Sequence, residues 1–488
     1  MNTLSDQILN GTKWYVSMRW CIKGLGFISS AILARLLLPE DFGLVAMVFV
    51  IFGLVELLFD FGVNWALIQN NKATDDDFHT AWTIRILQSL IVALTLLFCA
   101  PYIAHFYGDN RLELICQLMA LGTFIRGFEN IAIIKFQKEM KFAQDFTYNV
   151  LVKFAGIIIT ISLAFYFKSY LALVVSLVIN NLVIVIISHL IAKFRTRFSL
   201  KKAADIWKFS QWILVRNLAQ YISTHGDMFF LAMITSPAKV GYYKWGTELS
   251  YLTTSEIQLP FVRALLPSLA KIKDDHKKLI DTYLKALGMM TIVAVPIALG
   301  FGAVADELIP LFLGGGDKWL PVVPILQGLV FYAMALSMYN ISTTLLTVSG
   351  NVKYTAYIYW VQALITIAIL FPAFHLGGLA GVAYSRAVIG LIMFFVVSQI
   401  TVSRCQVDFI AIINNVWRPV LSGVMMYFIL FYGFDMWAME IWLKLICKII
   451  AGVSLYISIL LSLWWLSGKP NSAEATVIFR TRNMIRRP

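Results

Sequence analysis

Residues 14–43 read WYVSMRWCIKGLGFISSAILARLLLPEDFG, and this stretch contains the two features that decide the fold. Its apolar run is long enough to cross a membrane, because ~30 Å of hydrocarbon requires about 20 helical residues. The same run carries Arg19, Lys23 and Arg35. A charge near the bilayer centre costs at least about 2.5–3.5 kcal/mol, so these cations require a negative partner or water.

The composition of the whole chain predicts a polytopic membrane protein. Its 488 residues are 59% hydrophobic and 14% charged, and the mean hydropathy of +0.76 is far above that of soluble proteins. We predict an all-α integral membrane fold of about fourteen transmembrane helices. The predicted spans are 14–37, 42–67, 80–104, 112–134, 143–167, 169–193, 209–234, 241–267, 280–304, 320–348, 355–374, 378–402, 416–434 and 441–466.

The distribution of basic residues predicts the orientation. With a cytoplasmic N-terminus, more than half of the 40 Lys and Arg residues fall on the cytoplasmic side. The opposite face then holds four, Arg111, Lys168, Lys239 and Lys318. We therefore expect both termini in the cytoplasm. The net charge of +13 then reflects topology and attraction to anionic membrane lipids rather than nucleic-acid binding.

An internal repeat predicts how the spans are grouped. Three residues of the first half recur at one spacing in the second half: Pro39 and Pro237, Gly43 and Gly241, Trp14 and Trp212. We interpret each Pro-x-x-x-Gly stretch as a turn, where Pro ends a helix and Gly permits the reversal. The predicted parts are a six-helix lobe at 1–200, a second at 201–405, and helices 13 and 14 with a basic cytoplasmic tail at 406–488. We expect a pseudo-two-fold axis along the membrane normal to relate the lobes.

Cations within the spans predict an anion-binding site. Arg19 and Lys23 share one helix face, and Arg216 falls at nearly the same depth in the second half of the repeat. Arg and Lys side chains suit phosphate. The candidate pyrophosphate-binding residues are Arg19, Lys23, Arg216, Lys244 and Arg263. In an alternative interpretation, Arg19 and Lys23 snorkel to the membrane surface.

Acidic residues in the spans are candidates for ion coupling. They are Glu56, Asp60, Asp227 and Glu248, and such groups face the bundle interior or a wet cavity. Alternatively, Glu56 and Asp60 only neutralise cations of the first helix. His225 lies beside Asp227 and either relays a proton or is a buried, hydrogen-bonded histidine. The sequence shows no metal-ligand spacing, and we expect no metal or other cofactor.

Several stretches resemble a known family. ARLLLPEDFGLVAMVFVIFGLVELLFDFGVNWALIQ, APYIAHFYGD, FQKEMKFAQDF, KVGYYKWGTEL, LPSLAK, GGGDKWLPVVPILQGL and LLTVSGNVKY are similar to the Wzx-like polysaccharide-biosynthesis flippases of the multidrug/oligosaccharidyl-lipid/polysaccharide exporter superfamily. The resemblance implies a transporter that moves an undecaprenyl-pyrophosphate-linked oligosaccharide repeat unit across the bacterial inner membrane for lipopolysaccharide O-antigen or exopolysaccharide synthesis. It implies alternating access around a cationic central cavity lined by helices 1, 2, 7 and 8. It also implies a link to the polymerase and synthesis machinery.

Three other classes of function are weighed against this one. A drug or metabolite exporter of the same superfamily is the main alternative, although a cation-rich lining disfavours cationic compounds. A membrane enzyme such as a polymerase or glycosyltransferase would need a large loop or soluble domain, and the longest predicted connections, 194–208 and 268–279, are too short to fold alone. A structural partner of a synthesis complex would tolerate neutral replacement of the buried charges.

Overall fold

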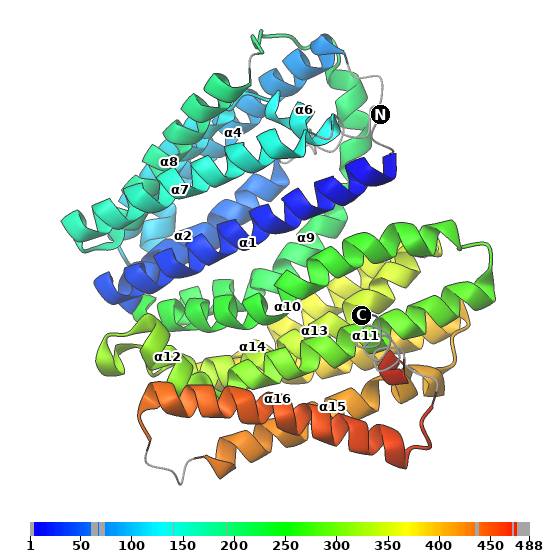
Figure 1. The fold of residues 1–488 in the computed structure, drawn as a ribbon. Helices are drawn as coiled ribbons and strands as arrows, with labels where there is room; N and C mark the ends of the chain where they lie inside the picture. Colours follow the sequence, from blue (N-terminus) through cyan, green and yellow to red (C-terminus); the bar gives the residue numbers. More distant parts are fainter. Residues whose placement is uncertain are drawn as a thin grey trace. The chain divides into compact units, whose positions relative to one another are not determined.

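The computed structural model of the protein is helical throughout the part that it describes. It describes residues 4–59, 67, 74–139, 141–192, 194–434, 439–470 and 473–475, without the side chains of 4–16, 137, 142 and 203–216. In these ranges all regular elements are helices (Figure 1). Nine of the described helices are long and apolar enough to cross a membrane. The predicted all-α membrane fold is confirmed.

The helix bounds are as follows. The elements before residue 203 are α1 (Leu4–Leu36), α2 (Pro39–Leu58), α4 (Asp75–Tyr107), α5 (Arg111–Gly127), α6 (Ile133–Lys138), α7 (Phe142–Phe167) and α8 (Tyr170–Ile191). The elements that follow are α9 (Ala203–Ile234), α10 (Pro237–Lys271), α11 (His276–Ala303), α12 (Ala305–Leu313), η1 (Gly316–Trp319), α13 (Val322–Val348), α14 (Val352–Cys405), α15 (Phe409–Gly433) and α16 (Ile441–Leu466).

Two predicted spans, 355–374 and 378–402, lie in the single element α14. Its 54 residues would measure about 81 Å as one straight helix, far more than a bilayer. The helix is broken at Gly377 and Gly378, and Gly378 has a φ of 57°, which glycine adopts without a Cβ penalty. The break divides α14 into two segments of spanning length. The short helices α6, α12 and η1 were not predicted, because so few residues carry no clear periodicity.

The chain divides into two compact units. Unit 1 is Met1–Tyr221 with Met228–Gly241, and unit 2 is Ile222–Asp227 with Tyr242–Pro488. One middle stretch of α9 therefore belongs to unit 2, although the turns on both sides belong to unit 1. The lobe boundaries at 200/201 and 405/406 stay predictions.

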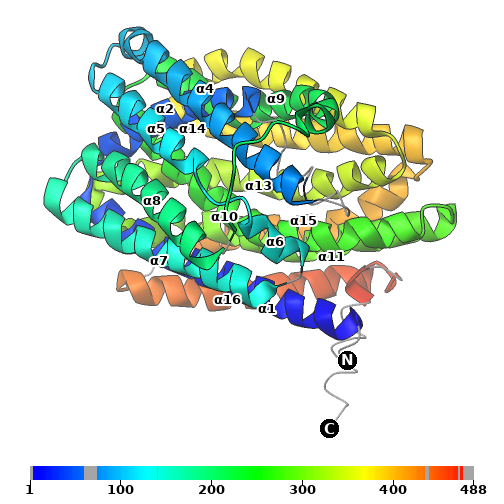
Figure 2. The same cartoon turned by 90° about the horizontal axis from the view of Figure 1, so that it is seen from above.

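The helices of unit 1 form a packed row. Figure 2 shows α4, α5, α8 and α7 side by side in this order, and α1 packs against α7. The helix α2 packs against α4, α5 and α8. Between α4 and α5 the core contains Val92, Ala93, Leu96 and Ala120, all at least 96% buried. Unit 1 is thus held together by apolar helix faces.

The core of unit 2 is built around α13. This helix packs against α11 and α14, and α11 also packs against α15, which contacts α16. In the span that contains α13, 72% of the most apolar window is buried inside the protein. A helix that is apolar on all sides is buried by its neighbours, so α13 serves as the central helix of unit 2.

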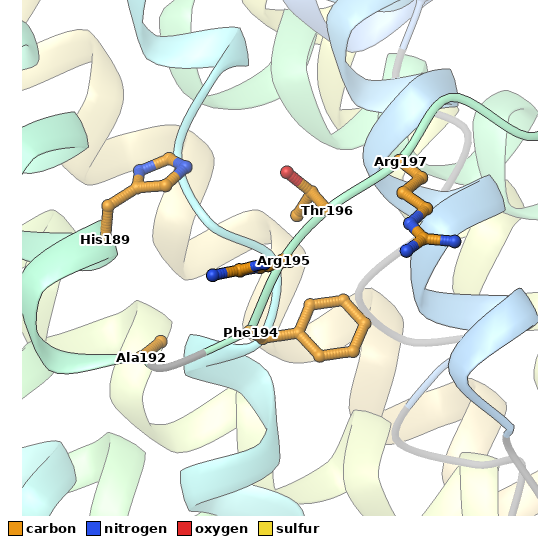
Figure 3. Close-up of a pocket in the computed structure, with 6 residues that line it drawn as sticks. All are labelled: His189, Ala192, Phe194, Arg195, Thr196 and Arg197. Atoms are coloured by element: carbon orange, nitrogen blue, oxygen red, sulfur yellow. The ribbon is translucent and has the colours of Figure 1, made fainter.

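A non-helical segment, 194–200, leads from α8 towards α9 and follows α4 (Figure 3). Its backbone is held by polar side chains of α4: the N–H of Arg197 binds His79 Nδ1 at 3.1 Å, and the N–H of Ser199 donates to Thr83 Oγ1 at 2.9 Å. The ring of Phe198 lies 5.1 Å from that of Trp82. We call 194–200 the linker. These bonds fix its path although it has no regular secondary structure.

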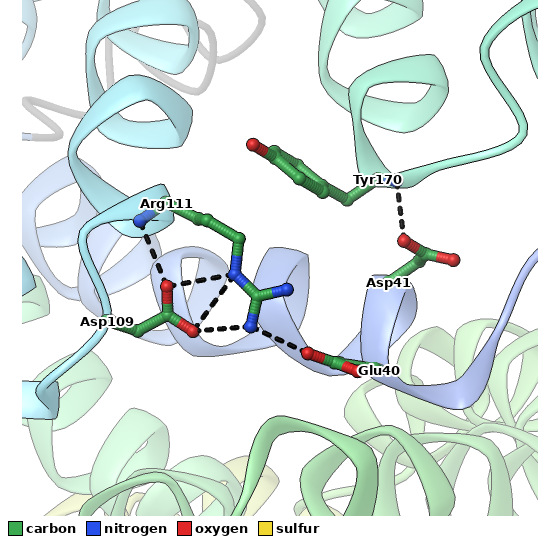
Figure 4. Close-up of polar contacts among 5 residues, drawn as sticks. All are labelled: Glu40, Asp41, Asp109, Arg111 and Tyr170. Atoms are coloured by element: carbon green, nitrogen blue, oxygen red, sulfur yellow. Dashed lines mark hydrogen bonds and ion pairs between the residues drawn. The ribbon is translucent and has the colours of Figure 1, made fainter.

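Carboxylates tie the start of α2 to its neighbours at the other end of unit 1 (Figure 4). Glu40 accepts a hydrogen bond from Arg111 Nη2 at 2.6 Å, and Arg111 also pairs with Asp109 at 2.7 Å. Asp41 accepts from the backbone N–H of Tyr170 at 2.7 Å. Hydrogen bonds from Arg111 hold the pKa of Asp109 below its ordinary value. This cluster fastens α2 to both α5 and α8.

The repeated glycines lie at a helix crossing. Pro39 and Pro237 are the first residues of α2 and α10, where the missing proline N–H costs nothing. A Cβ on Gly43 would overlap the carbonyl oxygen of Pro237, and a Cβ on Gly241 would overlap that of Pro39. The interpretation of these glycines as turn residues is wrong, because both lie inside helices. Their reciprocal contact is what a local two-fold relation produces, while the pseudo-symmetry of whole lobes stays a prediction.

Replacing either crossing glycine should therefore destabilise the protein. Gly43→Ala places a methyl group against a backbone carbonyl that cannot rotate away, and overpacking of this kind costs about 1–3 kcal/mol. The measurement is the unfolding temperature of the purified protein in detergent. Gly24→Ala in α1 is the matched control, since its added Cβ meets nothing within 4 Å. A Gly43→Ala protein as stable as the control would contradict the crossing.

Candidate functional site

Two packed helices of unit 1, α1 and α7, carry cations on neighbouring turns. Arg19 is half-buried and Lys23 is exposed on α1, and their four-residue spacing puts them on one face. The neighbouring helix α7 contributes Lys153, whose Nζ lies 3.7 Å from the position of a Cβ on Gly26. Gly26 is one turn beyond Lys23. We call Arg19, Lys23 and Lys153 the cation cluster.

Lys153 was missed in the sequence. It stands in the apolar stretch LVKFAGIII, residues 151–159, and a single lysine in such a span is itself a signal of function or pairing. Lys153 has no counterpart in the repeat and no second cation at helical spacing beside it. Only the packing of α7 on α1 shows that Lys153 lies beside Gly26.

The remaining predicted cations are spread over other elements. Lys244 pairs with Glu248 on α10 at 3.3 Å, and their side chains are 33% and 48% exposed. Arg263 is exposed further along the same helix. Arg216 belongs to α9, but its side chain lies outside the described residues. A single cleft formed by all five predicted cations stays a prediction.

The predicted acids have three different settings. Glu56 is exposed on α2, whereas Asp60 lies outside the described residues. Glu248 is paired with Lys244 as described. Asp227 is buried in unit 2, where only 6% of its side chain is exposed. Of the described candidates, Asp227 is the acid removed from water.

Asp227 is compensated by a buried arginine. Its Oδ2 accepts a hydrogen bond from the Tyr243 hydroxyl at 2.7 Å and lies 3.3 Å from Nε of Arg386 in α14. Only 1% of the Arg386 side chain is exposed. Its Nη1 donates to the Ser223 carbonyl oxygen at 2.9 Å and to Thr366 Oγ1 at 3.3 Å. Buried pairs persist when such additional hydrogen bonds satisfy the remaining groups.

Aromatic and amide groups surround this pair. The Arg386 guanidinium carbon lies 4.2 Å from the ring centroid of Tyr332, which adds a cation–π attraction. The Tyr332 hydroxyl accepts a hydrogen bond from Gln362 at 2.9 Å, and Tyr339 donates to the Gln362 oxygen at 3.2 Å. Asp227 is a candidate from the sequence, but sequence spacing gives no reason to pair it with Arg386.

Three more charge pairs are buried in the units. Arg85 binds Glu129 at 2.6 Å in unit 1, and in unit 2 Arg418 binds Glu474 at 2.8 Å and Lys448 binds Glu307 at 2.7 Å. Lys444 also approaches Glu307, at 3.3 Å. These lysines of α16 were missed, although two lysines four residues apart in an apolar span are a visible signal. Such pairs satisfy charge inside the protein.

The arrangement suits binding rather than bond-making chemistry. Within the described ranges, no group of three or more His, Cys, Asp or Glu residues could hold a metal ion. The cation cluster offers guanidinium and ammonium donors of the kind that bind phosphate oxygens. The Asp227–Arg386 pair offers a carboxylate that is shielded from water by tyrosines.

Comparisons with solved structures show the fold. The protein resembles the lipid II flippase MurJ in an inward closed conformation, with a TM-score of 0.75, 16% identity, and coverage of 93% of this chain and 99% of MurJ. It also resembles an inward-facing multidrug resistance MATE transporter, with a TM-score of 0.62, 15% identity, and coverage of 78% and 94%. That transporter belongs to the MOP superfamily.

Comparisons of sequence show relatives and a family. The lipopolysaccharide biosynthesis protein WzxC of Escherichia coli K12 is 24% identical over 72% of this chain and 72% of its own. The teichuronic acid biosynthesis protein TuaB of Bacillus subtilis 168 is 22% identical over 94% and 96%. The model of the polysaccharide biosynthesis protein family matches residues 32–324, more than half of the chain. The chain therefore belongs to the polysaccharide biosynthesis protein family.

Proposed function

We propose that this multi-pass membrane transporter is a flippase for a lipid-linked oligosaccharide. Its substrate is an undecaprenyl-pyrophosphate-linked repeat unit, which it moves to the outer leaflet of a bacterial inner membrane for surface polysaccharide synthesis. Family membership supports the link to polysaccharides. The fold shared with a lipid flippase supports transport of a lipid rather than catalysis. The bias of basic residues supports cytoplasmic termini.

The observation that carries the proposal is the cation cluster on α1 and α7. A pyrophosphate head group bears at least two negative charges, and moving them through hydrocarbon without compensation is prohibitive. Arg19 and Lys23 supply donors to the phosphate oxygens, and Lys153 beside Gly26 adds a third positive charge. The oligosaccharide and phosphates occupy a hydrated cavity during alternating access, while the polyprenyl tail stays in lipid. Arg216, Lys244 and Arg263 are further candidates for donors to the phosphates.

The main alternative is a drug or metabolite exporter with the same fold. The MATE likeness makes this alternative concrete. A cationic lining repels the cationic amphiphiles that such exporters commonly carry, whereas it attracts a pyrophosphate. Deletion of the gene should therefore reduce surface polysaccharide without changing sensitivity to cationic drugs.

We further propose that Asp227 couples transport to protons rather than to sodium. The Arg386 Nε lies 3.3 Å from the Asp227 carboxylate, so a positive charge already occupies the space beside it. A sodium ion would need several oxygen ligands in the space that the guanidinium fills, whereas a proton needs only one carboxylate oxygen. A proton would instead neutralise Asp227 and release its ion pair with Arg386, which changes how α9 is held against α14. Glu56, Asp60 and Glu248 remain weaker candidates for the coupling role.

Reversing the charge at Arg19 should abolish transport. Arg19→Glu replaces a phosphate donor with a repelling carboxylate, and losing one charged hydrogen bond costs about 1.5–3 kcal/mol, which is at least about tenfold in rate. We expect surface polysaccharide to fall at least tenfold in cells that depend on this protein. Arg19→Lys keeps the positive charge and should retain most of the activity. This control distinguishes the effect of charge from the effect of side-chain shape.

Both variants must be present in the membrane at the wild-type level, as measured by blotting of a tagged protein. Arg216→Glu should behave as Arg19→Glu does. If Arg19→Glu and Arg216→Glu cells make normal amounts of polysaccharide, these residues do not hold the substrate.

A proton gradient, but not a sodium gradient, should accelerate transport in proteoliposomes. Asp227→Asn removes the titrating group but leaves Arg386 uncompensated, a loss of about 3–5 kcal/mol in stability. The double variant Asp227→Asn/Arg386→Gln removes both charges, and it should be folded and insensitive to the proton gradient. Acceleration by sodium alone, or rates indifferent to both gradients, would contradict the coupling role of Asp227.

A further inference from the structure

A basic pocket lies beside the linker in unit 1 and is separate from the cation cluster. Its volume is about 560 Å³, and its lining comes from the end of α8 and from the linker. The lining residues are His189, Ala192, Phe194, Arg195, Thr196 and Arg197. No acidic residue is among them. The transport mechanism proposed above makes no use of this pocket.

Three polar side chains converge on one side of the linker. Figure 3 shows Arg195 and Thr196 extending to the side on which His189 lies, whereas Arg197 extends to the other side. Among the described residues, the Arg195 guanidinium has no hydrogen bond or ion pair. The His189 Nδ1 lies 3.0 Å from the Val185 carbonyl oxygen, so Nδ1 carries the shared proton and Nε2 is left to the pocket. A guanidinium, an imidazole and a hydroxyl therefore surround one space.

The pocket lies at the depth of lipid head groups. The 22 residues of α8 extend about 33 Å, which is the thickness of the hydrocarbon core, and His189 stands in the last turn. Apolar side chains next to the pocket are exposed: Leu190 by 72%, Phe198 by 71% and Leu200 by 55%. Exposed apolar groups beside unpaired cations are typical of a surface that contacts both acyl chains and phosphates.

The linker holds this arrangement in place. Asn130 donates from its side-chain amide to the carbonyl oxygens of Ala192 and Phe194 at 3.1 and 3.0 Å, and α4 binds the next residues through His79 and Thr83. Lys135 lies 4.2 Å from the Phe194 ring centroid. The backbone that presents Arg195 and Thr196 is therefore fixed before any ligand binds, which lowers the entropic cost of binding.

We propose that this pocket binds the phosphate of an anionic phospholipid, of the phosphatidylglycerol class. Arg195 donates a forked pair of hydrogen bonds to the phosphate, and Thr196 donates a third. The His189 ring borders the same space. The acyl chains lie against Phe198, Leu200 and Leu190. Since no carboxylate lines the pocket, a positively charged head group such as choline finds no partner there.

A bound lipid would fasten the linker to α8 within unit 1. Both segments belong to the stretch Met1–Tyr221 of that unit. A ligand that contacts α8 and the linker together makes their separation more costly, by mass action. The proposal does not depend on the substrate of the transporter.

The test measures the unfolding temperature of the full-length protein in a neutral detergent during titration with dioctanoyl-phosphatidylglycerol. A lipid that binds the folded state raises this temperature and gives an apparent Kd. Dioctanoyl-phosphatidylcholine and inorganic phosphate are titrated in parallel. We expect phosphatidylglycerol to stabilise the protein at concentrations where the other two do not. Equal effects of the two lipids would overturn the charge-specific site, and an equal effect of inorganic phosphate would assign the pocket to free phosphate.

The matched variants are Arg195→Gln and Lys201→Gln. They make the same change in charge six residues apart, but Lys201 does not line the pocket, and its ammonium lies 3.8 Å from Asp76. Arg195→Gln should raise the apparent Kd at least about tenfold, the loss expected for a charged hydrogen bond, and Lys201→Gln should change it less than about threefold. Equal losses would show a diffuse effect of charge and overturn the proposal. Neither residue is a candidate donor to the substrate phosphates, so failure here leaves the flippase proposal intact.

Discussion

A charge within a membrane-spanning helix must be compensated by another protein group, by water or by a ligand, because hydrocarbon supplies no partner. Both units meet this constraint with ion pairs inside the protein. In unit 2 the core contains the Asp227–Arg386 pair, closed by tyrosines and amides, and Glu307 between two lysines. In unit 1, Arg85 pairs with Glu129. The cations of α1 and α7 provide guanidinium and ammonium donors suited to phosphate oxygens, and the proposed function rests on them.

The crossing at Gly43 and Gly241 shows that the Pro-x-x-x-Gly pattern has a different structural role from the one predicted. As a sequence, LPEDFG and SPAKVG indicated two turns. In the structure, the prolines begin α2 and α10, and the glycines allow the two helices to approach until each backbone touches the other. Glycine is therefore required at positions 43 and 241 because each of these residues touches the backbone of the other helix. Substitution at this point affects the packing of the first turns of two helices at once.

The nine spanning helices among the described residues were predictable because each is a long apolar run, and length and composition together identify it. The joining of two spans in α14 and the short helices α6 and α12 were less visible, because breaks and single turns carry weak periodic signals. The sequence did not show which charged residues pair with one another. Arg386 and Asp227 lie in helices far apart in the chain, and only the packing of α9 on α14 brings them within 3.3 Å. Lys153 required the packing of α7 on α1 in the same way.

The central claim is that the protein moves a pyrophosphate-linked polyprenyl glycan across a bilayer. The most direct measurement reconstitutes the purified protein into liposomes with a fluorescent, short-chain polyprenyl-pyrophosphate sugar and follows its arrival in the outer leaflet with a membrane-impermeant quencher. The account predicts rapid exchange that requires the protein, and no acceleration for a neutral polyprenyl glycoside of the same length. Equal acceleration of both lipids, or exchange no faster than in protein-free liposomes, would contradict it.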